Sequence, residues 1–284
     1  MSHTRRAFLY QVLGACMASK ATALQRRAPA VARRNPEPFI GYGLVNLWYT
    51  IDAARLAARL HAAGCNFTEI EYVAWFNEAA RRGESAETRV RAAQRLVKAM
   101  RRRNITTMIS LVNWNGSAQR KQDDAWFLER LREIRSVIGP DRVILLPVSE
   151  PDGQEGGKAY RWAEMATREW PGLRAGNGDV GRGDPRVPGF DYVDWHHCDD
   201  FTEKTLRLTT AGKPTLNNTD CGPVLNPGPT RAAAMARIAL ARGAHFGVYG
   251  FKDSSIDETV IRALGEEICR RREAKTTPAS MPHS

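Results

Sequence analysis

Residues 105–148 read ITTMISLVNWNGSAQRKQDDAWFLERLREIRSVIGPDRVILLPV and carry a clear structural pattern. Apolar and β-branched residues over 105–114 predict a strand, and residues 123–138 repeat apolar side chains at helical spacing. We expect the helix to stop at Gly139-Pro140, and residues 142–148 predict a second buried strand. A strand, a helix and a strand in this order are typical of a parallel sheet with helical crossovers.

The same alternation continues on both sides of this unit. The further predicted strands are 39–47, 66–75, 173–178, 190–196, 214–219 and 246–251. The further predicted helices are 51–63, 86–103, 158–170, 202–210, 230–242 and 257–272. Eight strands in about 240 residues predict an α/β fold, a single (β/α)8 TIM barrel. A doubly wound sheet is disfavoured because no glycine-rich phosphate loop follows the first strand.

The N-terminal residues 1–23 are interpreted as an export signal. Thr4-Arg5-Arg6-Ala7-Phe8-Leu9 resembles the twin-arginine motif, and Ala21-Thr22-Ala23 offers a small-residue cleavage site. Leu13-Gly14-Ala15-Cys16 resembles a lipobox, which would make Cys16 a lipid anchor. A basic disordered tail is the alternative interpretation. The predicted location is periplasmic or extracellular, either as a free protein or as an anchored lipoprotein.

The remaining chain divides into a linker (24–38), the barrel (39–272) and a disordered tail (273–284). Residues 1–34 hold seven basic residues and no acidic one, so the formal charge of +11 falls to +4 without them. Nucleic-acid binding is disfavoured because basic and acidic residues alternate in the rest of the chain. No apolar stretch reaches the roughly 20 residues of a membrane span, and we expect a monomer.

Four cysteines follow the predicted signal, at widely spaced positions and without a CxxC pair. This spacing does not predict a zinc ribbon. An exported protein can form disulfides, so Cys198 and Cys221 are either a disulfide pair or free buried thiols. The other two are Cys65 and Cys269.

Polar and aromatic residues gather where the predicted strands end, which is the catalytic face of a parallel barrel. Flat aromatic faces beside amide and carboxylate groups suit sugar rings, so we predict a carbohydrate substrate. A single tryptophan more often packs under a loop, but Trp48, Trp75, Trp114 and Trp195 together favour a glycan cleft. The predicted substrate-binding residues are Trp48, Glu71, Asn113, Trp114, Asn177, Trp195, His196 and Asn218.

Glu150 is the leading catalytic candidate. It continues an apolar row on one face of its strand, formed by Ile144, Leu146 and Val148. Partial burial at the end of such a row raises the pKa of a carboxyl group, as a general acid requires. A capping or salt-bridged carboxylate is the alternative role.

Val148-Ser149-Glu150-Pro151 resembles the Asn-Glu-Pro signature of clan-A retaining glycoside hydrolases, the cellulase and mannanase-like barrels. In that clan the glutamate is the acid/base, and a second glutamate at the end of strand seven is the nucleophile. Thr219-Asp220-Cys221-Gly222 is similar to the strand-seven pattern, with aspartate in place of glutamate. The resemblance implies Asp220 as the second catalytic residue, and a role for His196 in contacting substrate or orienting a carboxylate.

Two departures from the family pattern leave the second carboxylate open. Ser149 replaces the asparagine that holds the sugar 2-hydroxyl, and Asp220 is shorter than glutamate by ~1.5 Å. An inward Asp220 also turns Asn217 and Thr219 outward, which is awkward without a bulge. Glu71 or Glu69 could instead pair with Glu150 and activate a water.

The leading hypothesis is therefore a cofactor-free glycoside hydrolase that cleaves β-linked glycans. The first alternative is a barrel that has lost catalysis and binds a glycan or a protein partner. The second alternative is a metal-dependent sugar isomerase or lyase with an octahedral site at Glu71, Glu150, His196 and Asp220. We predict no metal, because the His-x-His and His-x-x-Glu spacings of strong metal sites are absent.

Overall fold

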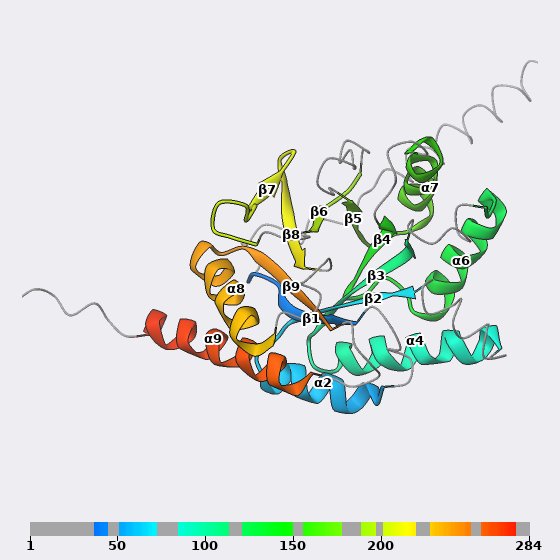
Figure 1. Cartoon of the computed structure of the whole chain (residues 1–284). Coiled ribbons are helices and arrows are strands. Elements are labelled where there is room, and N and C mark those ends of the chain that lie inside the picture. The colour runs from blue at the N-terminus through cyan, green and yellow to red at the C-terminus, as the bar shows by residue number, and fades with distance from the viewer. Residues whose placement is uncertain are drawn as a thin grey trace, which may run out of the picture. The chain divides into compact units, whose positions relative to one another are not determined.

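The structure is a computed structural model of the whole chain (Figure 1). Residues 38–284 form one compact unit. The predicted export signal and Cys16 lie outside the residues that the structure describes. The described residues are 37–44, 51–72, 85–113, 121–149, 156–177, 189–196, 201–219, 228–250 and 257–276.

Eight parallel strands close into a barrel, which confirms the predicted (β/α)8 fold. Neighbouring strands pair in chain order, and the ring closes through the pairings β1–β9 and β6–β8. The eight strands are β1 Ile40–Leu44, β2 Phe67–Glu71, β3 Thr106–Asn113, β4 Val143–Ser149, β5 Leu173–Asn177, β6 Tyr192–His196, β8 Lys213–Thr219 and β9 His245–Gly250.

Helices pack outside the strands and lie close to the positions predicted from helical spacing (Figure 1). Four of them begin at a capping side chain that accepts backbone N–H groups, and for the helix that begins at Glu258 this is Asp257, whose Oδ1 accepts from Val260 N at 3.1 Å. Asp52 Oδ1 accepts from Ala54 N at 2.9 Å, and Asp123 Oδ1 accepts from Trp126 N at 2.8 Å; Ser85 caps α4. The described helices are α2 Ala53–Ala62, α4 Ala86–Arg101, α6 Asp124–Val137, α7 Gly156–Glu169, α8 Gly228–Arg242 and α9 Glu258–Thr276.

The predicted helix over 202–210 is wrong. This segment forms turns and a short strand, β7 Thr209–Thr210, which pairs antiparallel with β8. The Thr202 and Thr205 hydroxyls bond to backbone N–H groups, which competes with helix formation. Ala211 and Gly212 both have positive φ, 49° and 75°, as a two-residue hairpin turn requires.

The lower half of the barrel interior is apolar. We call the buried cluster there the apolar floor; it comprises Phe67, Met108, Ile144, Leu146, Ala175, Tyr192 and Leu216. Phe39 closes the bottom, with its ring 5.0–5.8 Å from three aromatic neighbours, and its backbone N donates to His245 Nδ1 at 3.0 Å. Burial lowers the pKa of His245 to about 4, so the imidazole stays neutral at neutral pH.

A glycine in β9 allows close packing inside the barrel. A Cβ at Gly247 would lie 2.4 Å from the Asn218 side-chain oxygen. Because the glycine has no side chain, Asn218 can lie against the β9 backbone. The position of Asn218 therefore requires a glycine at position 247 of the neighbouring strand.

Two cysteines lie among the described residues, and both are free thiols. Cys65 is buried and Cys269 is exposed. Cys198 and Cys221 lie outside the described residues, so their pairing stays a prediction. Within the same described part of the chain, no helix has the length and apolar character needed to cross a membrane.

Candidate active site

Alternation along three strands places polar side chains above the apolar floor. On β2, Glu69 and Glu71 follow Phe67 at intervals of two residues, so they share its inward phase. The same spacing relates Asp194 and His196 to Tyr192 on β6, and Asn218 to Leu216 on β8. All five polar side chains are buried: Glu69, Glu71, Asp194, His196 and Asn218.

Four of these side chains contact one another, and we call them the polar layer: Glu69, Asp194, His196 and Asn218. Asn218 Nδ2 donates to Glu69 Oε2 at 3.1 Å and also to Asp194 Oδ1. Asp194 Oδ2 lies 2.6 Å from His196 Nε2. One neutral amide therefore joins two carboxyl groups from strands on different sides of the barrel. Desolvation disfavours carboxylate charge, so hydrogen-bond donors are needed to keep such groups buried.

Two buried polar atoms near this layer have no hydrogen-bond partner among the described residues. They are Asn218 Oδ1 and Ser110 Oγ. Ser110 lies on β3 directly in register with Glu71. Buried polar atoms in native proteins are usually paired with protein groups or ordered water. The barrel interior therefore keeps hydrogen-bonding capacity beside Glu71 and Asn218.

The structure brings together some of the predicted site residues. His196 and Asn218 are in register on neighbouring strands, and Glu71 ends β2 in a buried position. Asn113 and Asn177 end β3 and β5, but their side chains lie outside the described set. The predicted residues Glu150, Asp220, Trp48 and Trp114 also lie outside the described residues.

Trp195 is not brought to the polar layer. It alternates with Asp194 and His196 on β6, so its ring takes the opposite, outward phase. The guanidinium carbon of Arg207 lies 3.6 Å from the centre of the Trp195 ring, in cation–π geometry. The structure therefore gives Trp195 a packing contact on the outside of the barrel rather than a place beside His196.

Strand β8, which precedes Asp220 in the sequence, has no bulge where it pairs with β9. Residues 216–219 pair one to one with residues 245–248. Asn217 faces outward but is buried and satisfied, because its side chain bonds to the backbone N and O of Arg207 and to His245 O. The expected conflict between an inward Asp220 and an outward Asn217 therefore does not arise over residues 216–219.

Sequence reasoning missed the importance of Asp194 and Ser110. Asp194 lies two residues before His196 in the sequence, but the contact between them was not predicted. The signal for it was the two-residue spacing on one strand, which puts both side chains on one face. Ser110 could have been found by the same alternation, because it shares the phase of Met108 in the apolar floor.

Among the described residues, no group of three or more His, Cys, Asp and Glu side chains could hold a metal ion. The alternative metal site uses four residues, of which Glu150 and Asp220 lie outside the described residues. The polar layer itself is held by amide and imidazole contacts. Its described contacts therefore do not require a metal.

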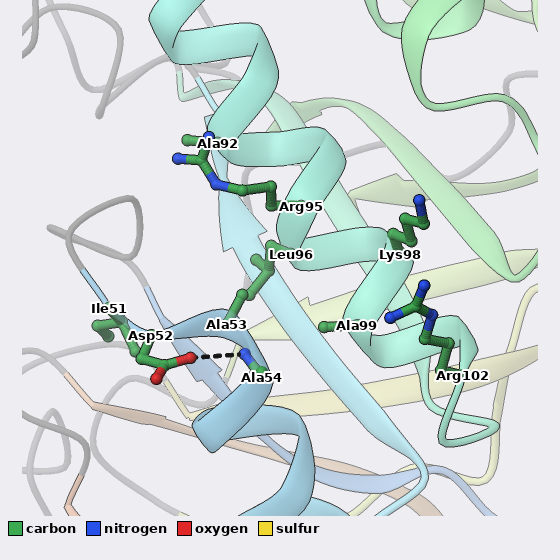
Figure 2. Close-up of a pocket in the computed structure, with 10 residues that line it drawn as sticks. All are labelled: Ile51, Asp52, Ala53, Ala54, Ala92, Arg95, Leu96, Lys98, Ala99 and Arg102. Atoms are coloured by element: carbon green, nitrogen blue, oxygen red, sulfur yellow. Dashed lines mark hydrogen bonds between the residues drawn. The ribbon is translucent and has the colours of Figure 1, made fainter.

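A cavity in the outer helical layer differs in character from the barrel interior. It has a volume of about 380 Å³ and lies between the start of α2 and one face of α4. Figure 2 shows Arg95, Lys98 and Arg102 around it, with the Asp52 carboxylate bonded to Ala54 N at the start of α2. Among the described residues that line it, the one carboxylate is that of Asp52, which is already used for capping, so these residues do not supply the paired carboxylates of a glycosidase site.

Solved structures of glycoside hydrolases share this barrel. An endo-β-1,4-mannanase from Thermotoga petrophila matches with a TM-score of 0.57 and 11% identity, over 85% of this chain and 78% of that chain. The chain folds like these enzymes. A family GH5_18 protein from Streptomyces cattleya, solved with GlcNAc, matches with a TM-score of 0.54 and 14% identity, over 87% and 82% of the two chains.

A GH30 endoxylanase from Clostridium papyrosolvens C71 also matches, with a TM-score of 0.54 and 10% identity, over 81% of this chain and 71% of that chain. No protein-family model matches the sequence, and no curated protein matches it. The remote resemblance to clan-A glycoside hydrolases is thus confirmed in the fold. At these identities the likeness concerns the fold alone.

Proposed function

We propose that the protein is a glycoside hydrolase that cleaves β-linked glycans, with Glu150 as acid/base. The observation that carries this proposal is the inward phase of β4. Ile144 and Leu146 belong to the apolar floor, and the strand ends at Ser149. Glu150 is the next residue of the chain and shares their parity in the sequence, and the residues that follow the strands of a parallel barrel are where its catalytic groups are expected.

The chemistry needs a second carboxylate on the other side of the scissile bond. Asp220 follows β8 directly, and Glu71 ends β2. Glu69 lies two residues deeper than Glu71 and is held by Asn218, so it supports the site from below. A separation of roughly 5–5.5 Å from Glu150 would give a retaining enzyme with a covalent intermediate, and roughly 6.5–9.5 Å an inverting one.

Hydrolysis of β-glucans, mannans and peptidoglycan tests the proposal. We expect Glu150→Gln to lower kcat by roughly 100-fold or more, because loss of general acid catalysis typically costs 10²–10⁴. Glu164→Gln, an exposed site on α7, is the matched control and should keep full activity. Equal turnover by wild type and Glu150→Gln, with both proteins folded by circular dichroism, would remove Glu150 from the mechanism.

A barrel that binds glycans without cleaving them is the second candidate function. The observation that favours it is Ser149, which takes the place of the family's sugar-holding asparagine and is only 1% exposed. Tight glycan binding with no hydrolysis between about pH 4 and 8 would support this candidate over the enzyme.

We further propose that the protein is exported, with the twin-arginine-like segment as its signal. The support is the sequence motif and the concentration of basic residues in the first 34 positions. N-terminal sequencing of the mature protein tests this proposal. A chain that still begins at Met1 in the cytoplasmic fraction would contradict it.

A further inference from the structure

Asp194 is held at both of its carboxyl oxygens. Asn218 Nδ2 donates to Oδ1, and His196 Nε2 lies 2.6 Å from Oδ2. Asp194 and His196 are 0% and 1% exposed, so water does not compete for either contact. Because the amide holds one oxygen, the carboxylate cannot rotate away from the imidazole without losing a hydrogen bond.

We propose that Asp194 is a positioning residue that fixes the orientation of the His196 ring with its proton on Nε2, which makes Nδ1 the unprotonated nitrogen of the neutral ring. This proposal rests on the proposed function, because it assigns His196 to the glycan site. An ionised carboxylate only accepts hydrogen bonds, so its partner nitrogen must carry the proton. The contact thereby selects the tautomer and the ring orientation together.

The neighbouring strands support this arrangement from two sides. On β8, Asn218 is in register with His196, and on β5, Asn177 is in register with Asp194. Among the described residues, the carboxyl group of Asp194 contacts the ring and Asn218 links it to Glu69 on β2; Glu71 lies one inward step higher on β2. Glu150 and Asp220 follow the ends of β4 and β8 in sequence. The imidazole is thus the one basic group of a layer that is otherwise amide and carboxyl.

Kinetics of Asp194→Asn provide the first test. The asparagine keeps the shape but can present an N–H to Nε2, which favours the wrong tautomer. We expect kcat to fall about 10- to 100-fold, as for other residues that orient a functional histidine, while KM changes about twofold or less. The matched control is Asp191→Asn, just before β6, whose carboxylate accepts from Arg174 N at 3.0 Å. It should retain wild-type kcat, and equal kcat values in the two variants would contradict the proposal.

Nitrogen-15 NMR of histidine-labelled protein provides the second test and needs no substrate. His196→Gln identifies the His196 signals among those of the 6 histidines. We expect the wild-type ring to carry its proton on Nε2, and Asp194→Asn to shift the ring toward the Nδ1–H tautomer. A wild-type ring protonated only on Nδ1 would overturn the proposal even if the variant does not fold.

The two tests separate this inference from the proposed function. If wild type hydrolyses no glycan but shows the Nε2–H tautomer, the positioning role stands and the glycosidase proposal fails. If wild type hydrolyses glycans and the His196 tautomer is the same in Asp194→Asn, the positioning role fails and the glycosidase proposal stands.

Discussion

The apolar floor and the polar layer are built on the same strands. On β2, Phe67 of the floor is followed two residues later by Glu69 of the polar layer, and both side chains face inward. Leu216 and Asn218 have the same relation on β8. A step of two residues, roughly 6.6 Å along a parallel strand, changes the interior from hydrocarbon to carboxyl and amide groups. We therefore expect the floor to stabilise the barrel and, under the proposed function, the polar layer to serve its chemistry. Substitutions in the floor should therefore show their effect in unfolding measurements, and substitutions in the polar layer should also show an effect in activity assays.

The largest effect on stability is expected in the floor, for Phe67→Ala. Its ring is 2% exposed and lies 5.5 Å from that of Phe39. Removing a buried phenyl ring typically costs about 3–5 kcal/mol in the free energy of unfolding. Urea denaturation measures the change, with Leu208→Ala, an exposed site, as the control that should lose little. Similar losses in the two variants would contradict a stabilising role for the floor.

The next effect concerns His245, the ionisable group at the bottom of the floor. Its pKa is about 4 in the folded protein and near 6.5 in the unfolded chain, so the unfolded state takes up the proton first. The contribution of His245 to the free energy of unfolding is fully present above about pH 6.5. Up to about 3 kcal/mol of this contribution is lost as the pH falls to 4. Unfolding free energies measured between these pH values test this expectation.

His245→Asn should reduce this pH dependence, because asparagine can keep an acceptor for Phe39 N but does not titrate. The control is His61→Asn, at an exposed position on α2, which should leave the wild-type slope unchanged. An unchanged slope in His245→Asn would show that other groups govern acid unfolding.

A further loss of stability is expected in the polar layer, for Asn218→Leu. The change removes the amide that donates to both Glu69 and Asp194, which typically costs about 1–3 kcal/mol per buried group left unpaired. Asn217→Leu on the outward face loses comparable hydrogen bonds without touching the layer. We expect both variants to be destabilised, but only Asn218→Leu to lose glycan hydrolysis. Equal activity in the two folded variants would remove the distinction between the faces.

Most of the fold could be predicted because strand and helix periodicity is a local property. The strand and helix positions agree with the structure to within a few residues in the described ranges. The predicted helix over 202–210 was wrong because threonine hydroxyls bond to the nearby backbone and the Ala211-Gly212 turn favours a hairpin. Both signals are present in the sequence, because the threonines and the Ala211-Gly212 pair are local features.

The candidate site was predicted only in part because its contacts are not local. Alternation placed Glu71, His196 and Asn218 inward, and the same alternation argues against grouping Trp195 with His196. The contact of Asn218 with Glu69 joins residues 149 positions apart and depends on how the strands are staggered around the barrel. Strand stagger is a property of the closed sheet and cannot be derived from the pattern of one segment.

The β7–β8 hairpin gives the barrel a natural insertion point for protein engineering. Its turn residues Ala211 and Gly212 are exposed and precede β8, so they lie at the end of the strand opposite to the one that carries Asn218. A Cβ at Gly212 would meet no atom within 4 Å. A peptide tag or fluorescent reporter inserted there would extend from the closed bottom of the barrel and leave the rim at the C-terminal strand ends unobstructed on an immobilised surface.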